Sequence, residues 1–166
     1  MHVEGHGNEM AQIVLTRIDN RLIHGQIVTE WCSYVQADVV LVANDAVAGD
    51  SLRQSLMKMA APASILTRYY TLAQTIQALK TSTSDQRVML LCETPQDVYT
   101  LVKGGLPIHT VNVGNMHMAK GKHRIATTVA IDENDQAVFR KLKECGVEFE
   151  IRRTPQCAIE KSDALG

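Results

Sequence analysis

The sequence lacks the features that mark several large classes of protein. Its apolar runs fall short of the roughly 18 residues that a membrane-spanning helix needs, and its first ten residues, MHVEGHGNEM, contain no signal-peptide core. The formal net charge of −1 provides no general attraction for nucleic acid or anionic lipid. The four cysteines are far apart and form no C-x-x-C pair, which argues against a metal site or a disulfide framework. We therefore expect a cytoplasmic protein with reduced, mostly buried thiols and no nucleic-acid partner.

Motifs for common cofactors, and for one common class of hydrolase, are missing as well. The chain has no G-x-x-x-x-G-K-[ST] loop, and no G-x-G-x-x-G follows its first apolar run. It also has no G-x-S-x-G elbow, the turn that carries the nucleophilic serine of α/β-hydrolases. These absences lead us to expect no nucleotide, no metal and no other cofactor.

What the chain does contain is a regular alternation of short apolar runs and helical patterns, without repeats or linkers. Parallel strands joined by crossover helices produce such a pattern, so we predict an open, mainly parallel α/β sheet of about seven strands with helices on both faces. The predicted strands are 12–18, 38–43, 64–70, 87–92, 108–113, 125–131 and 147–153. The 166 residues, 45% of them hydrophobic, suit one domain over 1–166. Its ordered core is expected over residues 12–153, with 1–10 as an upstream tail or cloning remnant and a loose tail after Pro155.

Capping residues and apolar spacing locate the helices between these strands. Asp50, Thr71 and Thr94 are suited to cap helices, and Pro95 suits the first turn of the helix after Thr94. The predicted helices begin at about Gly25, Ser51, Leu72, Pro95 and Glu133. In the second of them, Leu52, Leu56 and Met59 recur at helical spacing, and we predict that they face the core.

Ligands of an open parallel sheet bind at the carboxyl ends of its strands. Four loops of this chain should meet there: DNRLIHG, NDAVAGD, ETP and GNMH. Their content of Asn, Asp, His and Gly predicts a polar site at this edge. We expect the pocket residues of the second and fourth of these loops to be Asn44, Asp45, Gly114 and Asn115. The alternative is that both loops are plain turns, since such residues favour turns in any protein.

The first of these loops carries residues that are suited to a phosphate-accepting site. His24 directly precedes a helix that begins with Gly25 and Gln26, so unpaired backbone N–H groups and the positive helix end favour an anion beside its ring. Arg21 adds a planar, bidentate grip on phosphoryl oxygens, and Asp19 either orients the imidazole or holds Arg21. A histidine before a helix is also often a simple cap, and an Asp/Arg pair two residues apart is often a turn salt bridge. Residue types alone leave these interpretations open.

The stretch RIDNRLIHGQIV, residues 17–28, closely resembles the signature of the IIB component of mannose-family sugar phosphotransferase systems. That family handles mannose, fructose, sorbose and N-acetylgalactosamine, and its phosphoryl group is carried by the histidine before Gly-Gln, which here is His24. The similarity continues through VLVANDAVAGD, LVKGG and VNVGNMH with GK behind it, over residues 12–152. The last of these motifs resembles most the N-acetylgalactosamine or galactosamine branch.

The resemblance implies a phosphocarrier that needs no metal and no nucleotide. Its implied partners are a IIA protein that donates the phosphoryl group, the membrane components IIC and IID, and the imported sugar, with a homodimer as the oligomeric state. Such a protein is cytoplasmic and reaches the inner face of the membrane through IIC and IID. We further predict that Lys120, Lys122 and Arg124, in AKGKHR, dock the phosphorylated IIA; the alternative is a solvated connecting loop.

Two other functions remain alternatives on the residues alone. One is a non-catalytic α/β module that binds a phosphorylated ligand at the same edge, with His24 as a cap or contact. The other is a receiver-type domain phosphorylated on Asp45, which the lack of an acidic cluster after the first strand disfavours.

Overall fold

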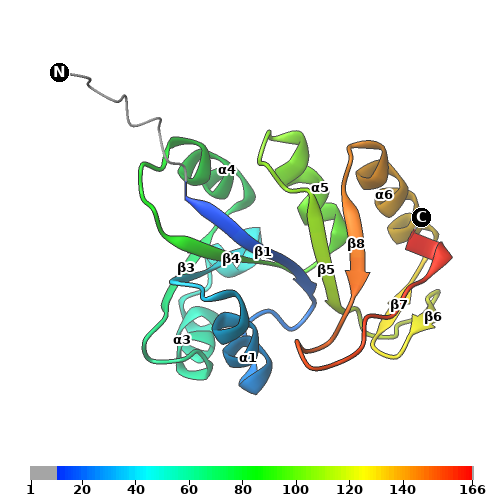
Figure 1. The fold of residues 1–166 in the computed structure, drawn as a ribbon, viewed down its shortest axis with the longest axis horizontal. Helices are drawn as coiled ribbons and strands as arrows, with labels where there is room; N and C mark the ends of the chain where they lie inside the picture. Colours follow the sequence, from blue (N-terminus) through cyan, green and yellow to red (C-terminus); the bar gives the residue numbers. More distant parts are fainter. Residues whose placement is uncertain (1–10, 166) are drawn as a thin grey trace.

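The computed structural model describes residues 11–165, so the tail expected at residues 1–10 lies outside the described residues. Six parallel strands form the main sheet in the order β3-β2-β4-β1-β5-β8, and β6 and β7 form a separate antiparallel pair (Figure 1). The single α/β domain with a mainly parallel sheet is therefore confirmed. The strands are β1 Gln12–Asp19, β2 Val39–Ala43, β3 Leu66–Tyr70, β4 Arg87–Cys92, β5 Thr110–Asn115, β6 His123–Ala126, β7 Val129–Ile131 and β8 Glu148–Ile151.

Strand β1 lies in the middle of the sheet, and its carboxyl end lies level with those of its neighbours. Asp19 at the end of β1 pairs with Asn115 at the end of β5, after a register shift between Ile18 and Asp19. On its other side, Ile18 pairs with Cys92, the last residue of β4. Ala43 of β2 also pairs with Cys92, so β4 separates β2 from β1. The predicted loops thus share one edge of the sheet, but the β5 loop is adjacent to the β1 loop and the β2 loop is not.

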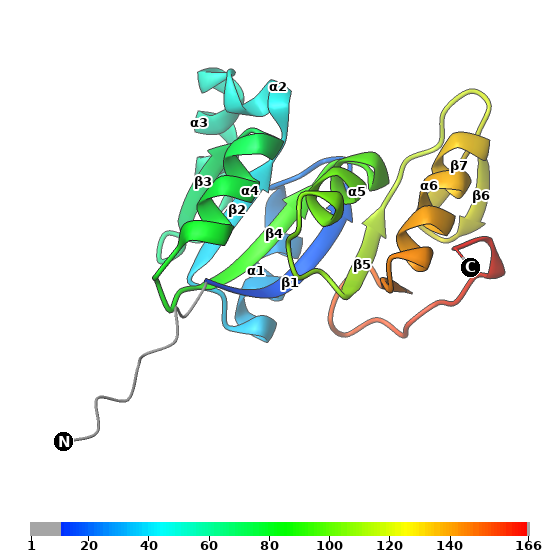
Figure 2. The same cartoon turned by 90° about the horizontal axis from the view of Figure 1, so that it is seen from above.

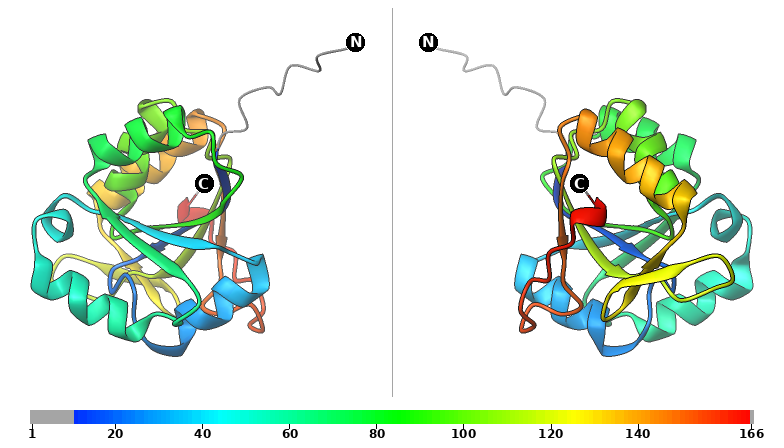
Figure 3. Two further views of the ribbon diagram at one scale, coloured as in Figure 1. Left: turned by 90° about the vertical axis from the view of Figure 1, so that its left-hand side faces the viewer. Right: turned by 90° about the vertical axis from the view of Figure 1, so that its right-hand side faces the viewer.

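Helices cover both faces of the sheet, as the sequence predicts. Figures 1 and 3 show α1 and α3 on one face and α4, α5 and α6 on the other. The helices are α1 Gly25–Val35, α2 Asp45–Ala48, α3 Ser51–Ala60, α4 Leu72–Thr81, α5 Pro95–Lys103 and α6 Glu133–Glu144, followed by a 3-10 turn, Asp163–Leu165. Asp50, Thr71 and Thr94 each accept a hydrogen bond from a backbone N–H in the first turn, so these predicted caps are confirmed. Within residues 11–165, the helices are too short or too polar to cross a membrane.

The orientation predicted for α3 is wrong. Leu52, Leu56 and Met59 are 69%, 58% and 82% exposed, and Met57 is the residue of this helix that is buried. Met57 joins the apolar cluster beneath α1, which includes Trp31. A ten-residue helix with apolar groups on two sides has no unique inward face by periodicity alone. Packing against the sheet selects the side that carries Met57.

The region after β5 also differs from the prediction. The expected strand at 125–131 is a hairpin, β6 and β7, and Figure 2 shows it beside α6 at the side of the molecule. The expected loose tail after Pro155 is partly ordered, because Ile151 forms an antiparallel bridge with Glu160. Leu165 is buried and packs in the core on the α6 side. Apolar contacts thus order the chain past the predicted end of the core.

Candidate functional site

The loop after β1 is held in one conformation by a buried leucine and a buried aspartate. Leu22 is fully buried, and its N–H donates to the carbonyl of Asp19 over 3.0 Å. Its φ of 58° lies in the left-handed region, where a residue other than glycine is strained unless its surroundings hold it there. Gly25, with a φ of 46°, makes the next sharp change of direction without a side-chain clash. Between these two residues the chain presents His24 at the sheet edge.

The imidazole of His24 is half-buried and does not cap α1. His24 occupies the N-cap position, but its side chain forms no capping bond with the helix. Instead, its Nδ1 donates to the carbonyl of Leu22 over 2.9 Å, since a carbonyl only accepts. Its Nε2 is buried and lies 3.8 Å from Oδ2 of Asp19. The simple cap interpretation does not describe this geometry.

Asp19 contacts both of the other predicted catalytic residues. Its Oδ1 accepts from the backbone N–H of Arg21 over 3.0 Å and lies 3.5 Å from the Nε of the same residue. Its Oδ2 faces His24, as described above. The Arg21 side chain is 43% exposed, so its terminal nitrogens remain open to a ligand. The two roles considered for Asp19, orienting the imidazole and holding Arg21, are therefore compatible in one geometry.

The helix that follows provides an anion site beside the imidazole. Gly25 and Gln26 are exposed and form the first turn of α1, whose leading N–H groups have no partner within the helix. The first turn contains no acidic residue that would neutralise the positive end of the helix. Backbone donors, Arg21 and the His24 ring thus lie within one short loop. Such a group can bind and stabilise a phosphoryl group.

The β5 loop borders this site directly. Asn115 donates through its side-chain amide to Oδ1 of Asn20, and the N–H of Asn20 donates to the carbonyl of Asn115 over 3.1 Å. Asn20 also donates to Nδ1 of His117, an exposed residue. Gly114 and Asn115 lie within strand β5, so the plain-turn interpretation of this segment is wrong.

The β2 loop, by contrast, is held by its own neighbours. Asn44 caps α2 by accepting from the N–H of Val47 over 2.9 Å, and it donates to Glu93 over 2.6 Å. Asp45 accepts from the N–H of Leu72 over 2.9 Å, at the start of α4. Because neighbouring strands lie roughly 5 Å apart, the end of β2 is about 10 Å from the end of β1. None of these hydrogen bonds links Asn44 or Asp45 to His24, and strand β4 lies between β2 and β1.

Asp97 lies on α5, where the Glu93 and Asp45 carboxylates influence its charge. Its partial burial raises its pKa to about 6, and the nearby Glu93 carboxylate adds to the effect, followed by that of Asp45. The hydrogen bond from Thr94 opposes the shift. This carboxyl therefore titrates close to neutral pH.

Arg17 is a residue at the site that sequence reasoning missed. It lies on β1 with 1% exposure, and its Nη2 donates to Oδ2 of Asp19 over 3.2 Å. Its Nη1 donates to Oδ1 of Asn112 over 2.5 Å and to the carbonyl of Arg152 over 3.0 Å. The guanidinium also lies over the Trp31 ring, 5.5 Å from its centroid. Burial lowers the pKa of Arg17, and the charge of Asp19 opposes that shift. The signal was visible, because Arg17 is the one charged residue in the run QIVLTRI.

Two of the three predicted docking residues have local partners. Lys122 forms an ion pair with Asp135 at 3.2 Å, and Arg124 donates to the carbonyl of Thr127 over 2.8 Å. Lys120 is exposed on the loop between β5 and β6. Of the predicted docking group, Lys120 is the side chain best placed to meet a partner.

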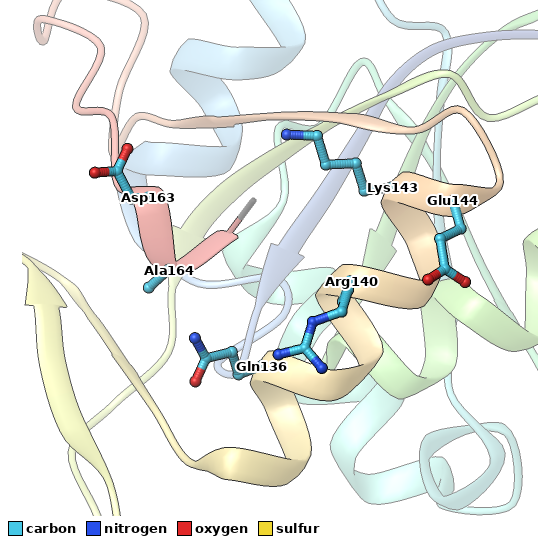
Figure 4. A pocket seen from close by; sticks show the side chains of 6 residues that line it. All are labelled: Gln136, Arg140, Lys143, Glu144, Asp163 and Ala164. Carbon is cyan, nitrogen blue, oxygen red and sulfur yellow. The ribbon is translucent and has the colours of Figure 1, made fainter.

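A hollow of about 300 Å³ lies between α6 and the C-terminal turn (Figure 4), and its lining mixes Arg140 and Lys143 with Glu144 and Asp163. Residues 11–165 contain no group of three metal-ligating side chains.

All four cysteines are free thiols. Cys32 and Cys92 are buried, but Cys157 is half-buried and Cys145 is exposed, so the expected burial holds for two of the four.

Comparison with known proteins places this geometry in a family. Residues 13–165 match the family model of the PTS system sorbose subfamily IIB component. The chain is 47% identical over 146 residues to the N-acetylgalactosamine-specific phosphotransferase enzyme IIB component 2 of Escherichia coli K12, covering 88% of this chain and 93% of that protein. It is 36% identical to the fructose-specific EIIB component of Bacillus subtilis, over 91% of this chain and 93% of the relative.

Solved structures agree with these matches. The N-acetylgalactosamine-specific IIB component 1 from Escherichia coli superposes with a TM-score of 0.86 and 39% identity, over 90% of this chain and 99% of that one. The IIB domain of the sorbose permease from Klebsiella pneumoniae superposes with a TM-score of 0.84 and 34% identity, over 90% and 92%. The chain therefore belongs to the sorbose-subfamily IIB components of the sugar phosphotransferase system, and it is a phosphotransferase.

Proposed function

We propose that this protein accepts a phosphoryl group on His24 from a IIA component and passes it to a sugar during import through IIC and IID. The observation that carries the proposal is the joint placement of His24, Arg21 and the exposed first turn of α1 around one point at the sheet edge. Asp19 links the first two of these residues from beneath. The chain acts at the cytoplasmic face of the membrane, which it reaches through IIC and IID, and as a homodimer.

The reaction consists of two displacements at phosphorus. In the first, a lone pair on the His24 ring forms a bond to phosphorus, while the P–N bond to the IIA histidine breaks and its electron pair returns to that ring. In the second, a sugar hydroxyl oxygen bonds to phosphorus, the P–N bond to His24 breaks, and the electron pair returns to the imidazole. The hydroxyl proton passes to a base outside this chain.

The resting position of the ring adds one step to this sequence. Nδ1 is bonded to the Leu22 carbonyl, and Nε2 is buried toward Asp19. Neither nitrogen faces an incoming phosphoryl group in this position, so the ring turns about its side-chain bonds before it attacks. Arg21 and the N–H groups of Gly25 and Gln26 then stabilise the charge on the transferred oxygens.

The substrate class follows the relatives. We propose N-acetylgalactosamine or galactosamine as the sugar, ahead of mannose, fructose and sorbose. Support comes from the 47% identical relative, whose name specifies N-acetylgalactosamine, and from the motif VNVGNMH with GK behind it. Membrane vesicles that contain IIC and IID of each candidate system test this choice, because only the matching set should release sugar phosphate.

The test of the acceptor uses phosphoenolpyruvate, the general phosphotransferase proteins and a matching IIA. We expect wild type to take up one phosphoryl group that is lost in mild acid and survives alkali. Mass spectrometry under non-acidic conditions should map this group to His24. His24→Gln should take up none. Acid-labile phosphate on His24→Gln would refute the assignment. A bond lost in both acid and alkali would indicate Asp45, and no covalent phosphate on wild type would indicate a binding module.

A further inference from the structure

Beneath the site lies a buried arginine that no part of the proposed transfer uses directly. The guanidinium of Arg17 is enclosed by Asp19, Asn112, the Arg152 carbonyl and the Trp31 ring. At 1% exposure it is out of reach of a partner protein or a sugar. Whatever it contributes to transfer must pass through a residue that it contacts.

Asp19 is the contact that leads to the site. Its side chain is 1% exposed, and a carboxylate in such a position is strongly destabilised unless cations or donors surround it. One oxygen, Oδ2, receives Arg17 at 3.2 Å and faces Nε2 of His24 at 3.8 Å. The other, Oδ1, receives the backbone N–H and the Nε of Arg21. The orientation of one carboxylate therefore sets the position of Arg21, and the same carboxylate lies against the His24 ring.

Arg17 also determines which arginine forms the main ion pair with Asp19. Because the guanidinium is clamped by Asn112 and the Arg152 carbonyl, it approaches Asp19 from a fixed direction inside the sheet. Without it, the exposed guanidinium of Arg21 is the remaining arginine that pairs with Asp19, and a full pairing would draw Arg21 inward. That movement would take Arg21 away from the phosphoryl oxygens.

We infer that Arg17 is a positioning residue for phosphoryl transfer, which holds the Asp19 carboxylate so that Arg21 stays available to the phosphoryl group. The inference rests on the proposed function. It predicts a loss in the chemical step and not in partner binding. Misplacement of catalytic groups by about 1 Å lowers rates by roughly a hundredfold, which sets the expected scale.

The experiment measures transfer from phosphorylated IIA to wild type, Arg17→Met, Arg17→Lys and Leu101→Ala. Leu101 is a fully buried core residue on α5, so Leu101→Ala provides a matched loss of stability away from this network. We expect Arg17→Met to lower kcat by about 30- to 100-fold with KM for IIA within twofold of wild type. Arg17→Lys should recover part of kcat, because it restores charge but not the fork. Leu101→Ala should keep the wild-type kcat when assayed below its own Tm.

A second arm uses Asp19→Asn as the background. If Arg17 acts through Asp19, adding Arg17→Met to Asp19→Asn should lower kcat by less than about fivefold further. Fully multiplicative losses would overturn the inference, as would a wild-type kcat for Arg17→Met. Equal slowing of Leu101→Ala and Arg17→Met at matched stability would also overturn it. If Arg17→Met does not fold, Arg17→Lys decides the kcat and KM comparison. Failure of wild type to accept phosphate would instead refute the proposed function.

Discussion

Gly114→Ala tests the physical basis of the site at its most crowded point. Gly114 lies in β5, directly against the guanidinium of Arg17. A methyl group on its Cα would overlap the guanidinium carbon and both terminal nitrogens. The backbone here is not in the left-handed region, so the glycine is needed for space and not for its φ. By strand propensity alone, alanine would be favoured over glycine by about 0.5–1 kcal/mol.

The steric term should exceed that preference and reverse its sign. Overfilling a packed interior costs about 1–3 kcal/mol, and breaking a buried ion pair such as Arg17–Asp19 costs roughly 3–5 kcal/mol. Because the methyl group displaces the guanidinium without removing it, we expect a net loss of about 2–4 kcal/mol. For a domain of this size that corresponds to a Tm lower by roughly 5–15 °C.

Thermal unfolding followed by circular dichroism measures this effect, with Gly49→Ala as the matched control. A Cβ at Gly49 meets only the Ala46 carbonyl at 3.9 Å, so this change should leave Tm unchanged or raise it slightly. Phosphoryl transfer by Gly114→Ala should also slow, because Asp19 loses its fixed partner. A Gly114→Ala protein as stable as Gly49→Ala would refute the reasoning. The reasoning would also be refuted if Gly114→Ala lowered Tm equally in an Arg17→Met background, because there the methyl group no longer meets a guanidinium.

Three further predictions address the exposed parts of the site and the Asp97 carboxyl group. Arg21→Ala should slow transfer roughly ten- to a thousandfold with a nearly unchanged Tm, because the half-exposed guanidinium serves the phosphoryl group more than the fold; a large fall in Tm with normal transfer would contradict this. Lys120→Glu should slow transfer from IIA severalfold at low salt, and its rate should approach that of wild type as the Debye length falls below about 10 Å. Lys122→Glu should instead mainly lower Tm, because it breaks the ion pair with Asp135. Equal rates for Lys120→Glu and wild type at every ionic strength would contradict the steering role. Asp97 has a folded pKa of about 6, above its ordinary 3.8, so its contribution to stability is complete below the lower value and is lost as pH rises through the higher one. Asp97→Asn should therefore match wild type near pH 4 and exceed its free energy of unfolding by about 1 kcal/mol above pH 7, after allowance for solvent screening of a half-exposed group; denaturant unfolding at the two pH values measures this, and a constant difference would exclude the titration as its cause.

The local elements were predictable because their causes lie within a few residues. The apolar run at β4 and the caps at Asp50, Thr71 and Thr94 depend on neighbours in the chain, and the structure confirms them. Much of the loop from Asp19 to His24 is equally local, since the bonds from Arg21 and Leu22 to Asp19 and from His24 to Leu22 join residues two or three positions apart. Residue types and spacing were sufficient to locate a candidate site in this loop, and the family resemblance of RIDNRLIHGQIV was needed to propose what the loop does.

The errors arose where two local patterns were equally acceptable. Helix α3 carries apolar residues on two sides, and periodicity does not show that Met57 packs inward while Leu52 and Leu56 remain exposed. The stretch 125–131 has strand composition throughout, yet a turn at Thr127 divides it into a hairpin. In both cases the choice depends on surfaces supplied by distant parts of the chain.

The sequence by itself determined the alternation of strands and helices, the helix caps, and the loop that carries Asp19, Arg21 and His24, because all of these depend on short-range periodicity and hydrogen bonding. Only the tertiary structure decided the strand order, which places Asn115 beside Asn20, 95 residues away, and separates Asn44 from His24 by one strand. It also decided that Arg17 reaches across to Asn112 and fills the space left by Gly114. Those contacts depend on which strands pair and in what register, and burial of the whole apolar surface selects that pairing.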